Sequence, residues 1–585
     1  MNEAEASATE LTPPRIERRL APEAAELPAE LPAVLRRIYA ARGIRHADEI
    51  ERSLSGLLAP QEMGGADAAA GLIADVIERG GSLLVVGDFD ADGATSCALA
   101  VLAIRAMGHP HIDYLVPNRF DYGYGLTPEI VELARAGKPD LIITVDNGIS
   151  SIEGVAAANA AGIPVVVTDH HLPGECLPDA AAIVNPNAAG NGFPSKVAAG
   201  VGVIFYVLLR LRSLLQERAW FERIAAEPPN MAQFLDLVAL GTVADVVPLD
   251  RNNRILVHQG LMRIRAGECR PGILALLEVA GRDHRRVQAN DLGFAVGPRL
   301  NAAGRLDDMS RGIACLLAET RGQAEPLARE LDRLNRERRE IEQDMQQQAE
   351  AILGAWHPDL QMLPWGLCLF QEDWHQGVIG ILASRIKERY HRPVIAFAGV
   401  GDGTLKGSAR SIAGLHIRDA LDRLATRHPD LLQKFGGHAM AAGMTIRRAD
   451  LERFSQAFDE VVRERLDERD LQPLIASDGS IPAEEFNFDT AQSILDGGPW
   501  GQGFAEPMFD DVFEVRSSRI VGERHWKLLL QHAQVQQLVV DAIAFNAVQD
   551  CPQMPPRIRA AYRMDINEWR GQRSLQIRIE YMEPA

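Results

Sequence analysis

Acidic and histidine side chains follow three apolar runs of this sequence. Asp88, Asp90 and Asp92 come directly after SLLVV, Asp146 follows LIITV, and Asp169-His170-His171 follow VVVT. Carboxylate oxygens with imidazole nitrogens are ligands for divalent ions, and an oxygen-rich set favours Mn²⁺ or Mg²⁺. Two such ions about 4 Å apart can activate a water and hold the attacking and leaving oxygens of a phosphodiester. These residues therefore predict metal-assisted phosphoester hydrolysis.

Three other interpretations of the aspartate cluster deserve comparison. A calcium loop of the EF-hand type needs a glutamate at its twelfth position, which is Leu99 here, and a flanking helix rather than a strand. A phosphotransferase with an aspartate nucleophile also places D-x-D after a strand, but it gives no reason for the histidines at a neighbouring strand. Capping the next helix needs one aspartate, whereas three crowded carboxylates repel one another unless a cation offsets them.

These residues need elements that bring them together. From about residue 80 to 170, continuous β-branched runs alternate with helical stretches, which is typical of buried parallel strands in an α/β sheet. Ligand sites of such sheets lie at the carboxyl ends of the strands. We therefore expect the three acidic segments to converge at one edge of a mainly parallel sheet.

Other segments predict a multidomain chain. Apolar residues in PLARELDRLNRERREIEQDMQQQAEAILGAW have nearly coiled-coil spacing over about 30 residues, which predicts a long helix connecting two domains. A second, smaller α/β segment occupies about 360–460. The segment from about 470 to 585 has short strands with period-two alternation, which predicts a small β-barrel.

Composition limits the class of protein. A chain of 585 residues is too long for one core. Six scattered cysteines favour neither a zinc site nor a disulfide framework, and the net charge of −19 argues mildly against a nucleic-acid partner. The sequence shows no signal peptide and no apolar run of membrane-spanning length, so we expect a cytoplasmic protein without membrane association.

Two sets of motifs resemble a known family. GDFDADGATS, VDNGIS, TDHH and LGTVADVVPL, which contains Asp245, resemble the successive motifs of the DHH phosphoesterase superfamily. GPRLNAAGR, LDRLNRERR, WHQGVIGILASRI, LKGSARS, FGGHAMAAG and GPWGQGF resemble the RecJ single-strand-specific DNA exonucleases. The resemblance implies a flexible N-terminal extension (1–35), a DHH catalytic domain (36–270), a helical connector with the long helix (271–355), a DHH-associated substrate-binding domain (356–465) and an OB-type β-barrel that binds single strands (466–585).

The resemblance also implies roles at the metal centre. It makes five residues the ligands of two Mn²⁺ or Mg²⁺ ions: Asp90, Asp92, Asp146, His170 and Asp245. Asp88 is expected to support catalysis as an outer or second-metal group, and Asp169 to accept the other N–H of a ligating imidazole. His171 is a candidate for contacting the scissile phosphate. Arg299 and Arg305, with Asn301, on the glycine-rich GPRLNAAGR loop could bring positive charge to that phosphate.

A second set of residues is implied to bind the DNA end. Strand alternation places Lys406, Ser408 and Arg410 on one face, which suits a phosphate pocket. FGGHAMAAG adds Gly436 and Gly437, whose backbone a ligand can approach, and His438 as a donor. Arg119 is a further candidate for the 5′ end. In the barrel, arginines interleaved with Tyr562 and Trp569 suit a single-strand groove, although packing is the commoner role of such aromatics.

The carboxylates and histidine predict hydrolysis, and the resemblance implies that the enzyme is a metal-dependent 5′-to-3′ exonuclease that degrades single-stranded DNA to mononucleotides in repair and recombination. Its expected partners are single-stranded DNA, a helicase and a single-strand-binding protein, and the enzyme is expected to be a monomer. Two alternatives stay open from the residues alone: a DHH phosphodiesterase of short oligoribonucleotides or cyclic dinucleotides, and an inactive DHH scaffold.

Overall fold

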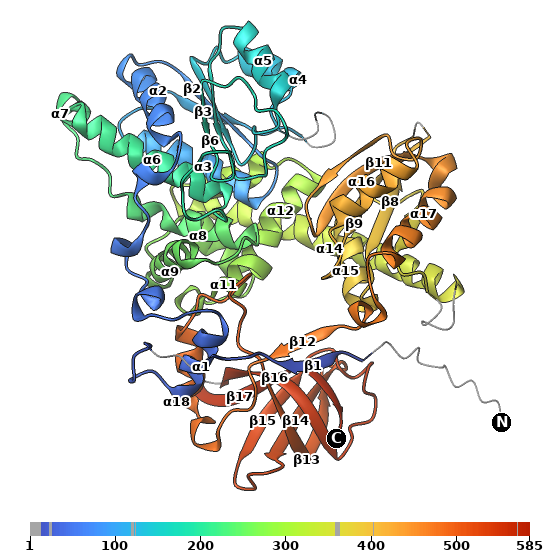
Figure 1. The fold of residues 1–585 in the computed structure, drawn as a ribbon. Coiled ribbons are helices and arrows are strands. Elements are labelled where there is room, and N and C mark those ends of the chain that lie inside the picture. The colour runs from blue at the N-terminus through green and yellow to red at the C-terminus, as the bar shows by residue number, and fades with distance from the viewer. Residues whose placement is uncertain are drawn as a thin grey trace. The chain divides into compact units, whose positions relative to one another are not determined.

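The chain folds into two units (Figure 1). The larger unit combines residues Arg19–Asn335 with Asp478–Ala585, and the smaller combines the N-terminal residues up to Arg18 with Arg336–Ser477. This computed structural model describes residues 13–22, 26–118, 122, 125–356, 363–401, 403–569 and 571–585. Arg119, a candidate for the DNA end, lies outside the described residues.

A five-stranded parallel sheet forms the centre of the larger unit, in the order β3-β2-β4-β5-β6. Its strands are β2 (Leu83–Gly87), β3 (Ile112–Leu115), β4 (Leu141–Val145), β5 (Val165–Thr168) and β6 (Ala182–Val184). The strands are mostly buried because helices cover both faces, which explains their nearly continuous apolar sequences. The predicted parallel α/β sheet is confirmed.

Helices cover both faces of this sheet (Figure 1), and each set of helices packs against a different set of strand residues. α4 (Pro128–Arg135) and α5 (Ile152–Ala160) share a core with Val86, Ile142 and Val167. On the other face, α2 (Ala66–Glu78), α3 (Ala91–Ala106) and α6 (Gly200–Glu217) pack with the alternate strand residues, such as Val85 and Ile143. Further helices extend this core: α7 (Trp220–Arg223), α8 (Leu235–Ala244), α9 (Arg251–Ala266), α10 (Pro271–Val279), α11 (Ala289–Asp291), α12 (Gly297–Leu306) and α13 (Ser310–Leu317).

The larger unit also contains a closed barrel in the order β13-β14-β15-β17-β16. Its strands are β13 (Phe509–Val521), β14 (His525–His532), β15 (Val539–Ala544), β16 (Arg557–Trp569) and β17 (Gln572–Pro584), and α18 (Phe488–Asp496) precedes them. Near the other end of the chain, α1 (Ala33–Ala41) joins this C-terminal part. The Tyr39 hydroxyl donates to the Gly497 carbonyl at 2.8 Å, and Arg42 forms an ion pair with the buried Asp478 at 2.8 Å.

The smaller unit is built around a mixed sheet in the order β10-β11-β9-β8-β7. Its strands are β7 (Leu367–Gln371), β8 (Val394–Gly399), β9 (Thr404–Arg410), β10 (Lys434–Gly437) and β11 (Ala441–Arg447), with helices α15 (Ile379–Tyr390), α16 (Ile417–Arg427) and α17 (Leu451–Arg463). β1 (Arg15–Arg18) pairs in parallel with β12 (Leu474–Ser477). The segment expected to be a flexible extension therefore contains a paired strand.

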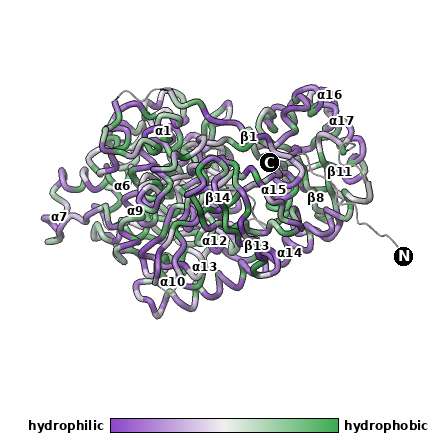
Figure 2. Tube along the Cα trace, turned by 90° about the horizontal axis from the view of Figure 1, so that it is seen from below, coloured by the Kyte–Doolittle hydropathy of each residue, from purple (hydrophilic) through white to green (hydrophobic). Residues whose placement is uncertain are grey.

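One long helix, α14 (Arg321–Trp356), leads from the larger unit into the smaller along the chain, so the predicted connecting helix is confirmed. Hydrophobic and hydrophilic residues are interspersed along the whole trace (Figure 2). Within the described ranges, no helix combines the length and the hydrophobicity needed to cross a membrane. The predicted fold class, a mainly parallel sheet, a long connecting helix, a smaller α/β part and a C-terminal barrel, is confirmed.

Candidate metal centre

The aspartate cluster extends from the turn after β2 into the first residues of α3. Asp90 precedes the first helical residue, and its Oδ1 accepts hydrogen bonds from the backbone N–H groups of Asp92 and Gly93, both at 3.0 Å. Capping therefore accounts for one oxygen of one aspartate. Gly93 is required here, because a Cβ at this position would lie 2.4 Å from the Asp88 carbonyl oxygen. The tight turn brings all three aspartates to the carboxyl end of β2.

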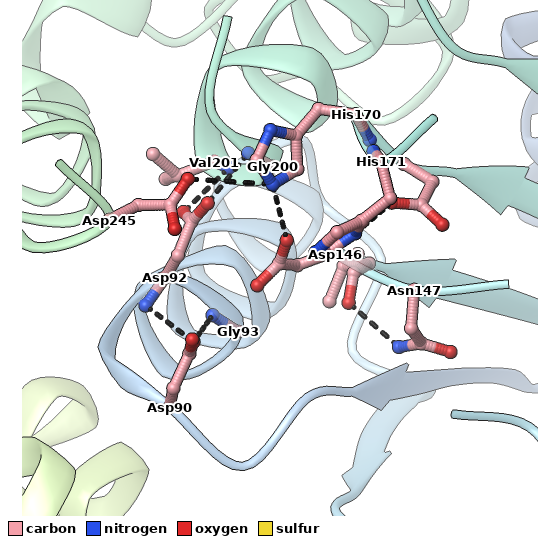
Figure 3. A network of polar contacts seen from close by, with 12 residues as sticks. Asp90, Asp92, Gly93, Asp146, Asn147, His170, His171, Gly200, Val201 and Asp245 are labelled. Atoms are coloured by element: carbon pink, nitrogen blue, oxygen red, sulfur yellow. Dashed lines mark hydrogen bonds and ion pairs between the residues drawn. The ribbon is translucent and has the colours of Figure 1, made fainter. Parts of the chain in front are cut away.

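The buried carboxylate of Asp92, on α3, lies against the N-terminus of a second helix, α6. Its two oxygens accept hydrogen bonds from the N–H groups of Gly200 at 2.6 Å and Val201 at 2.9 Å, where α6 begins (Figure 3). Backbone donors at a helix N-terminus stabilise a negative charge. These bonds fix the direction of the carboxylate.

Asp146 follows β4 in the left-handed backbone conformation, with a φ of 59°. The amide of Asn147 donates to the carbonyls of Val86 at 3.0 Å and Val145 at 2.9 Å, which ties the ends of β2 and β4 together. Gly200 closes over the buried Asp146, since a Cβ on that glycine would lie 2.6 Å from the Asp146 Cβ. Asn147 and Gly200 are not among the residues predicted from the sequence, although Asn147 lies within the VDNGIS motif.

The ring of His170 lies between two carboxylates from different elements. Its Nε2 is 3.1 Å from Oδ1 of Asp146 and 3.4 Å from Oδ2 of Asp245, which follows the last residue of α8 (Figure 3). Loop, strand end and helix end therefore meet at one imidazole. The predicted convergence of the acidic segments is confirmed.

His171 has a different partner. Its Nδ1 lies 2.7 Å from Oδ1 of the buried Asp169, whose Oδ2 accepts from the Ile149 N–H at 2.9 Å. Burial opposes a charge on this imidazole, but the bond to Asp169 and the charges of Asp169, Asp88 and Asp90 outweigh it and raise the pKa of His171 to about 9. Asp169 was expected to hold the ring of a ligating imidazole; it holds the ring of His171 rather than that of His170.

Among the residues that the structure describes, three overlapping groups of side chains could each hold a metal ion. Within each group, the candidate ligand atoms lie within 4.8 Å of one another. The groups are Asp146, His170 and His171; Asp92, His170 and Asp245; and Asp88, Asp90 and Asp146. Every residue predicted as a ligand belongs to at least one group. Carboxylate oxygens with imidazole nitrogens fit Mn²⁺ and Mg²⁺.

The electrostatics of the cluster also fit a cation. Burial, and then the charge of Asp90, raises the pKa of Asp92 to about 7. Burial, and then the charges of Asp92 and Asp90, raises the pKa of Asp146 and of Asp245 well above the ordinary value. Like charges held close together in a buried site favour protonation or a bound cation.

The segment GPRLNAAGR is a helix, α12, and not the loop that the glycines suggested. Two of its residues touch the aspartate turn: Oδ1 of Asn301 accepts from the Ala91 N–H at 2.8 Å, and a Cβ on Gly304 would lie 1.9 Å from the Phe89 carbonyl oxygen. At its first turn, a Cβ on Gly297 would contact Ala244, the neighbour of Asp245. The glycines allow close packing of α12 against two segments that carry acidic residues.

Arg299 points into the protein from α12. It is buried, forms an ion pair with Asp332 at 2.8 Å and donates to the Ala295 carbonyl at 2.6 Å. Arg305 lies in the last turn of the same helix and is partly exposed. Contact of either arginine with a phosphate stays a prediction.

Apart from Arg119, the residues predicted for the DNA end lie in the sheet of the smaller unit or directly after one of its strands. On β9, Lys406, Ser408 and Arg410 alternate with buried residues, so they share one face as expected. Nη1 of Arg410 lies 3.2 Å from the Ser408 hydroxyl and donates to the Ala409 carbonyl at 2.8 Å. Burial lowers the pKa of Arg410.

Glycines continue this face across the neighbouring strands. Ser408 pairs with Gly443 on β11, which pairs with Gly436 on β10, and a Cβ on Gly436 would meet no atom within 4 Å. Gly437 follows with a φ of 149°, and then His438, whose N–H donates to the Ala441 carbonyl at 2.8 Å. The exposed backbone at Gly436 therefore continues the face that carries Ser408 and Arg410.

Several barrel residues have internal roles. Arg559, Arg563 and Arg578 form ion pairs with acidic residues of the same unit, and the Arg578 pair with Glu580 measures 2.9 Å. Tyr562 is fully buried and donates to Asp511 at 2.7 Å, while Trp526 is buried. Packing is therefore the role of Tyr562 and Trp526. The side chain of Trp569, the other aromatic predicted for the groove, lies outside the described part of the chain, as does Arg570, one of the interleaved arginines.

Comparison with known proteins identifies the family. Three family models match this chain: the N-terminal domain of the DHH family over residues 82–242, the DHHA1 domain over 364–464 and the RecJ OB domain over 477–581. The single-stranded-DNA-specific exonuclease RecJ of Salmonella typhimurium is 57% identical over 572 residues, which cover 97% of this chain and 99% of the relative. This chain belongs to the RecJ family.

Solved structures of the RecJ family extend the comparison to metal ions. A crystal structure of RecJ from Thermus thermophilus in complex with Mn²⁺ matches with a TM-score of 0.78 and 28% identity, covering 98% of this chain and 80% of that one. A second, in complex with Mg²⁺, matches with a TM-score of 0.72 and 27% identity over 98% and 79% of the two chains. A relative with this fold therefore binds each of the two ions that the acidic cluster fits.

Proposed function

We propose that this member of the RecJ family hydrolyses single-stranded DNA from the 5′ end to mononucleotides, in DNA repair and recombination. The observation that carries the proposal is the position of His170, which lies between Asp146 at the end of β4 and Asp245 at the end of α8, in a group of crowded carboxylates. The relative at 57% identity is named for single-stranded-DNA-specific exonuclease activity, which supports the substrate class. An inactive scaffold would have no chemical need for this set of side chains.

Five residues are proposed to hold two Mn²⁺ or Mg²⁺ ions: Asp90, Asp92, Asp146, His170 and Asp245. When bound, the ions offset the crowded negative charge and lower the pKa of a water that attacks the phosphodiester. The chain contributes fixed ligands, because Asp92 is held by the beginning of α6 and Asp90 by its own helix cap. Asp88 adds a further buried carboxylate to the group.

His171 is proposed to contact the scissile phosphate. With a pKa of about 9, its imidazole is protonated at neutral pH and offers a positive charge to the phosphate oxygens. Asp169 fixes the ring and keeps it charged. Arg299 and Arg305 are proposed to add positive charge; the buried ion pair of Arg299 with Asp332 favours Arg305 for direct contact.

The open face of the smaller unit is proposed to bind the 5′ end. Arg410 and Ser408 lie side by side there, and an arginine fork with a hydroxyl suits a phosphate. The other proposed contacts on this face are Lys406, Gly436, Gly437 and His438. Arg119 is a further candidate for the 5′ end, and Asn301 is proposed to act with Arg299 and Arg305 near the scissile phosphate.

Further assignments follow from this activity as part of the proposal. The barrel binds single strands, a helicase supplies them from duplex DNA, and a single-strand-binding protein covers them. The enzyme acts as a monomer in the cytoplasm, without membrane association. The domain boundaries are those expected from the sequence, at about residues 35, 270, 355 and 465.

Digestion of one oligonucleotide, labelled separately at each end, tests the proposal. With Mn²⁺, the 5′-labelled strand should release its label at once as a mononucleotide, whereas the 3′-labelled strand should become shorter step by step. Without a divalent ion, neither strand should be degraded. Release of the 3′ label first would contradict the polarity. Faster turnover of cyclic dinucleotides or short oligoribonucleotides than of long DNA would favour that alternative instead.

A further inference from the structure

The loop that carries the two histidines has no regular structure of its own. From Asp169 to Ala181, no residue belongs to a helix or strand. Buried backbone groups nevertheless need hydrogen-bond partners. Oδ1 of Asp169 accepts from the N–H groups of His170 at 2.7 Å and His171 at 3.1 Å, so one side chain satisfies both donors. The carbonyls of the two histidines are held by a different segment.

Two asparagines bind these carbonyls. Nδ2 of Asn187 donates to the His170 carbonyl at 2.7 Å, and Nδ2 of Asn185 donates to the His171 carbonyl at 2.9 Å. The position follows from the sheet: β6 runs parallel to β5 and its last residue is Val184, so the segment NPN begins directly beside the end of β5. Side-chain amides thus replace the strand ladder where it stops.

The asparagines are themselves fixed. Oδ1 of the fully buried Asn185 accepts from the Asn187 N–H at 2.7 Å, and Nδ2 of Asn191 donates to the Asn185 carbonyl at 2.8 Å. Nζ of Lys196 donates to the carbonyls of Pro186 at 2.8 Å and Asn191 at 2.6 Å. Residues 185–196 therefore form a hydrogen-bonded frame around the histidine loop.

We propose that Asn185 and Asn187 are positioning residues for catalysis. By fixing the carbonyls on the C-terminal side of His170 and His171, they set the peptide planes and hence the directions in which the two rings point. The ring of His170 has to meet carboxylates on two other elements, so a small rotation of its backbone would separate it from both. This inference rests on the proposed ligation of metal by His170.

Asn187→Ala is the direct test, because Asn187 is only partly buried and its loss leaves the frame around Asn185 in place. Loss of a group that orients a ligand lowers metal affinity or activity about 10- to 100-fold. We expect weaker Mn²⁺ binding in calorimetry and a lower kcat, with an unchanged KM for single-stranded DNA. Asn187→Asp keeps the shape but turns a carboxylate towards the His170 carbonyl, so it should be impaired at least as much.

Asn159→Ala is the matched control, since Nδ2 of Asn159 makes the same kind of bond to a carbonyl of the same loop, that of Asp179 at 2.8 Å, but eight residues after His171 in the sequence. It should leave Mn²⁺ affinity and kcat unchanged. Unchanged affinity and kcat in both Asn187 variants would overturn the inference. His170→Ala separates the two proposals. If this variant loses Mn²⁺ binding while the Asn187 variants behave normally, only the positioning role is refuted. If His170→Ala binds Mn²⁺ normally, the proposed ligation of the metal by His170 is itself refuted. Should Asn187→Ala not fold, Asn187→Asp carries the test.

Discussion

The affinity of this chain for Mn²⁺ should fall steeply as the pH is lowered through 7. A carboxylate binds a metal ion in its ionised form, so a proton on a ligand competes with the ion. Burial and the neighbouring Asp90 raise the pKa of Asp92 to about 7, from an ordinary value of 3.8. The competition therefore falls in a pH range where an ordinary surface aspartate would be fully ionised.

The size of the effect follows from this pKa. Between about pH 8 and about pH 6, the ionised fraction of Asp92 falls from roughly nine-tenths to roughly one-tenth, and below that it falls about tenfold per pH unit. Asp146 and Asp245 have raised pKa values for the same reasons, so they make the dependence steeper. We expect the dissociation constant for Mn²⁺ to rise at least about tenfold over this range.

Calorimetric titration of the metal-free protein with Mn²⁺ measures this dependence, and buffers with different ionisation enthalpies count the protons released. More than half a proton should be released per protein near pH 7 if Asp92 and its neighbours titrate together. Asp140→Asn, at an exposed carboxylate beyond the opposite ends of the strands, serves as the control and should keep the same pH dependence. A dissociation constant that does not change between pH 6 and 8 would refute the raised pKa values and the crowding that causes them.

The thermal stability of the metal-free protein should also depend on pH, because a carboxyl group whose pKa is raised by folding stabilises the folded state only at low pH. The stabilisation from Asp92 is complete below about pH 4 and is lost as the pH rises through 7. The Tm of the metal-free protein should therefore fall over this pH range, and added Mn²⁺ should raise it again. Gly200→Ala should weaken Mn²⁺ binding at least about tenfold, because the new Cβ would lie 2.6 Å from that of Asp146. Asp169→Asn should lower the pKa of His171 from about 9 towards its ordinary value, measured by NMR, and reduce kcat about 10- to 100-fold. Arg410→Ala should reduce the preference for a 5′-phosphorylated strand over a 5′-hydroxyl strand about tenfold, as expected for one charged hydrogen bond, with Mn²⁺ affinity unchanged.

Each of the three predictions for Gly200→Ala, Asp169→Asn and Arg410→Ala would be contradicted by a particular result. Gly202→Ala is the control for Gly200→Ala, because its Cβ would make only an ordinary contact at 3.7 Å; equal Mn²⁺ affinity in the two variants would contradict the steric argument. An unchanged pKa of His171 in Asp169→Asn would show that other groups hold its charge. An unaltered 5′-phosphate preference in Arg410→Ala would place the phosphate pocket elsewhere.

The sequence was sufficient to predict the sheet and its acidic edge. β-branched runs define strands that are buried on both faces, and the rule that parallel strands share one carboxyl edge brings Asp88, Asp146 and His170 together without any knowledge of their contacts. Spacing could not reveal which side chain each group touches. Asp169 shows this, because only the folded loop determines that it bonds the ring of His171.

Glycine was the least informative residue type before the structure was known. In GPRLNAAGR the glycines suggested a loop, whereas the structure uses Gly297 and Gly304 for close helix packing in α12. Both roles depend on the missing Cβ, and a local pattern cannot separate them. Arg299 is a similar case: its sequence suits a phosphate contact, but its partner Asp332 comes from a distant helix.

The contact of α1 with the segment before the barrel has a consequence for synthesis of the protein. Gly497, the partner of Tyr39, is synthesised 458 residues later. At a translation rate of about 5–20 residues per second, the interval between the two residues lasts about 20 to 90 s. Throughout this time the apolar face of α1 has left the ribosome without its final partner. The parallel sheet, which lies between α1 and Gly497 in the sequence, can fold first, so the two ends of the chain are joined last. In nascent chains stalled before residue 497, protease should therefore cleave near α1, while the sheet is already protected.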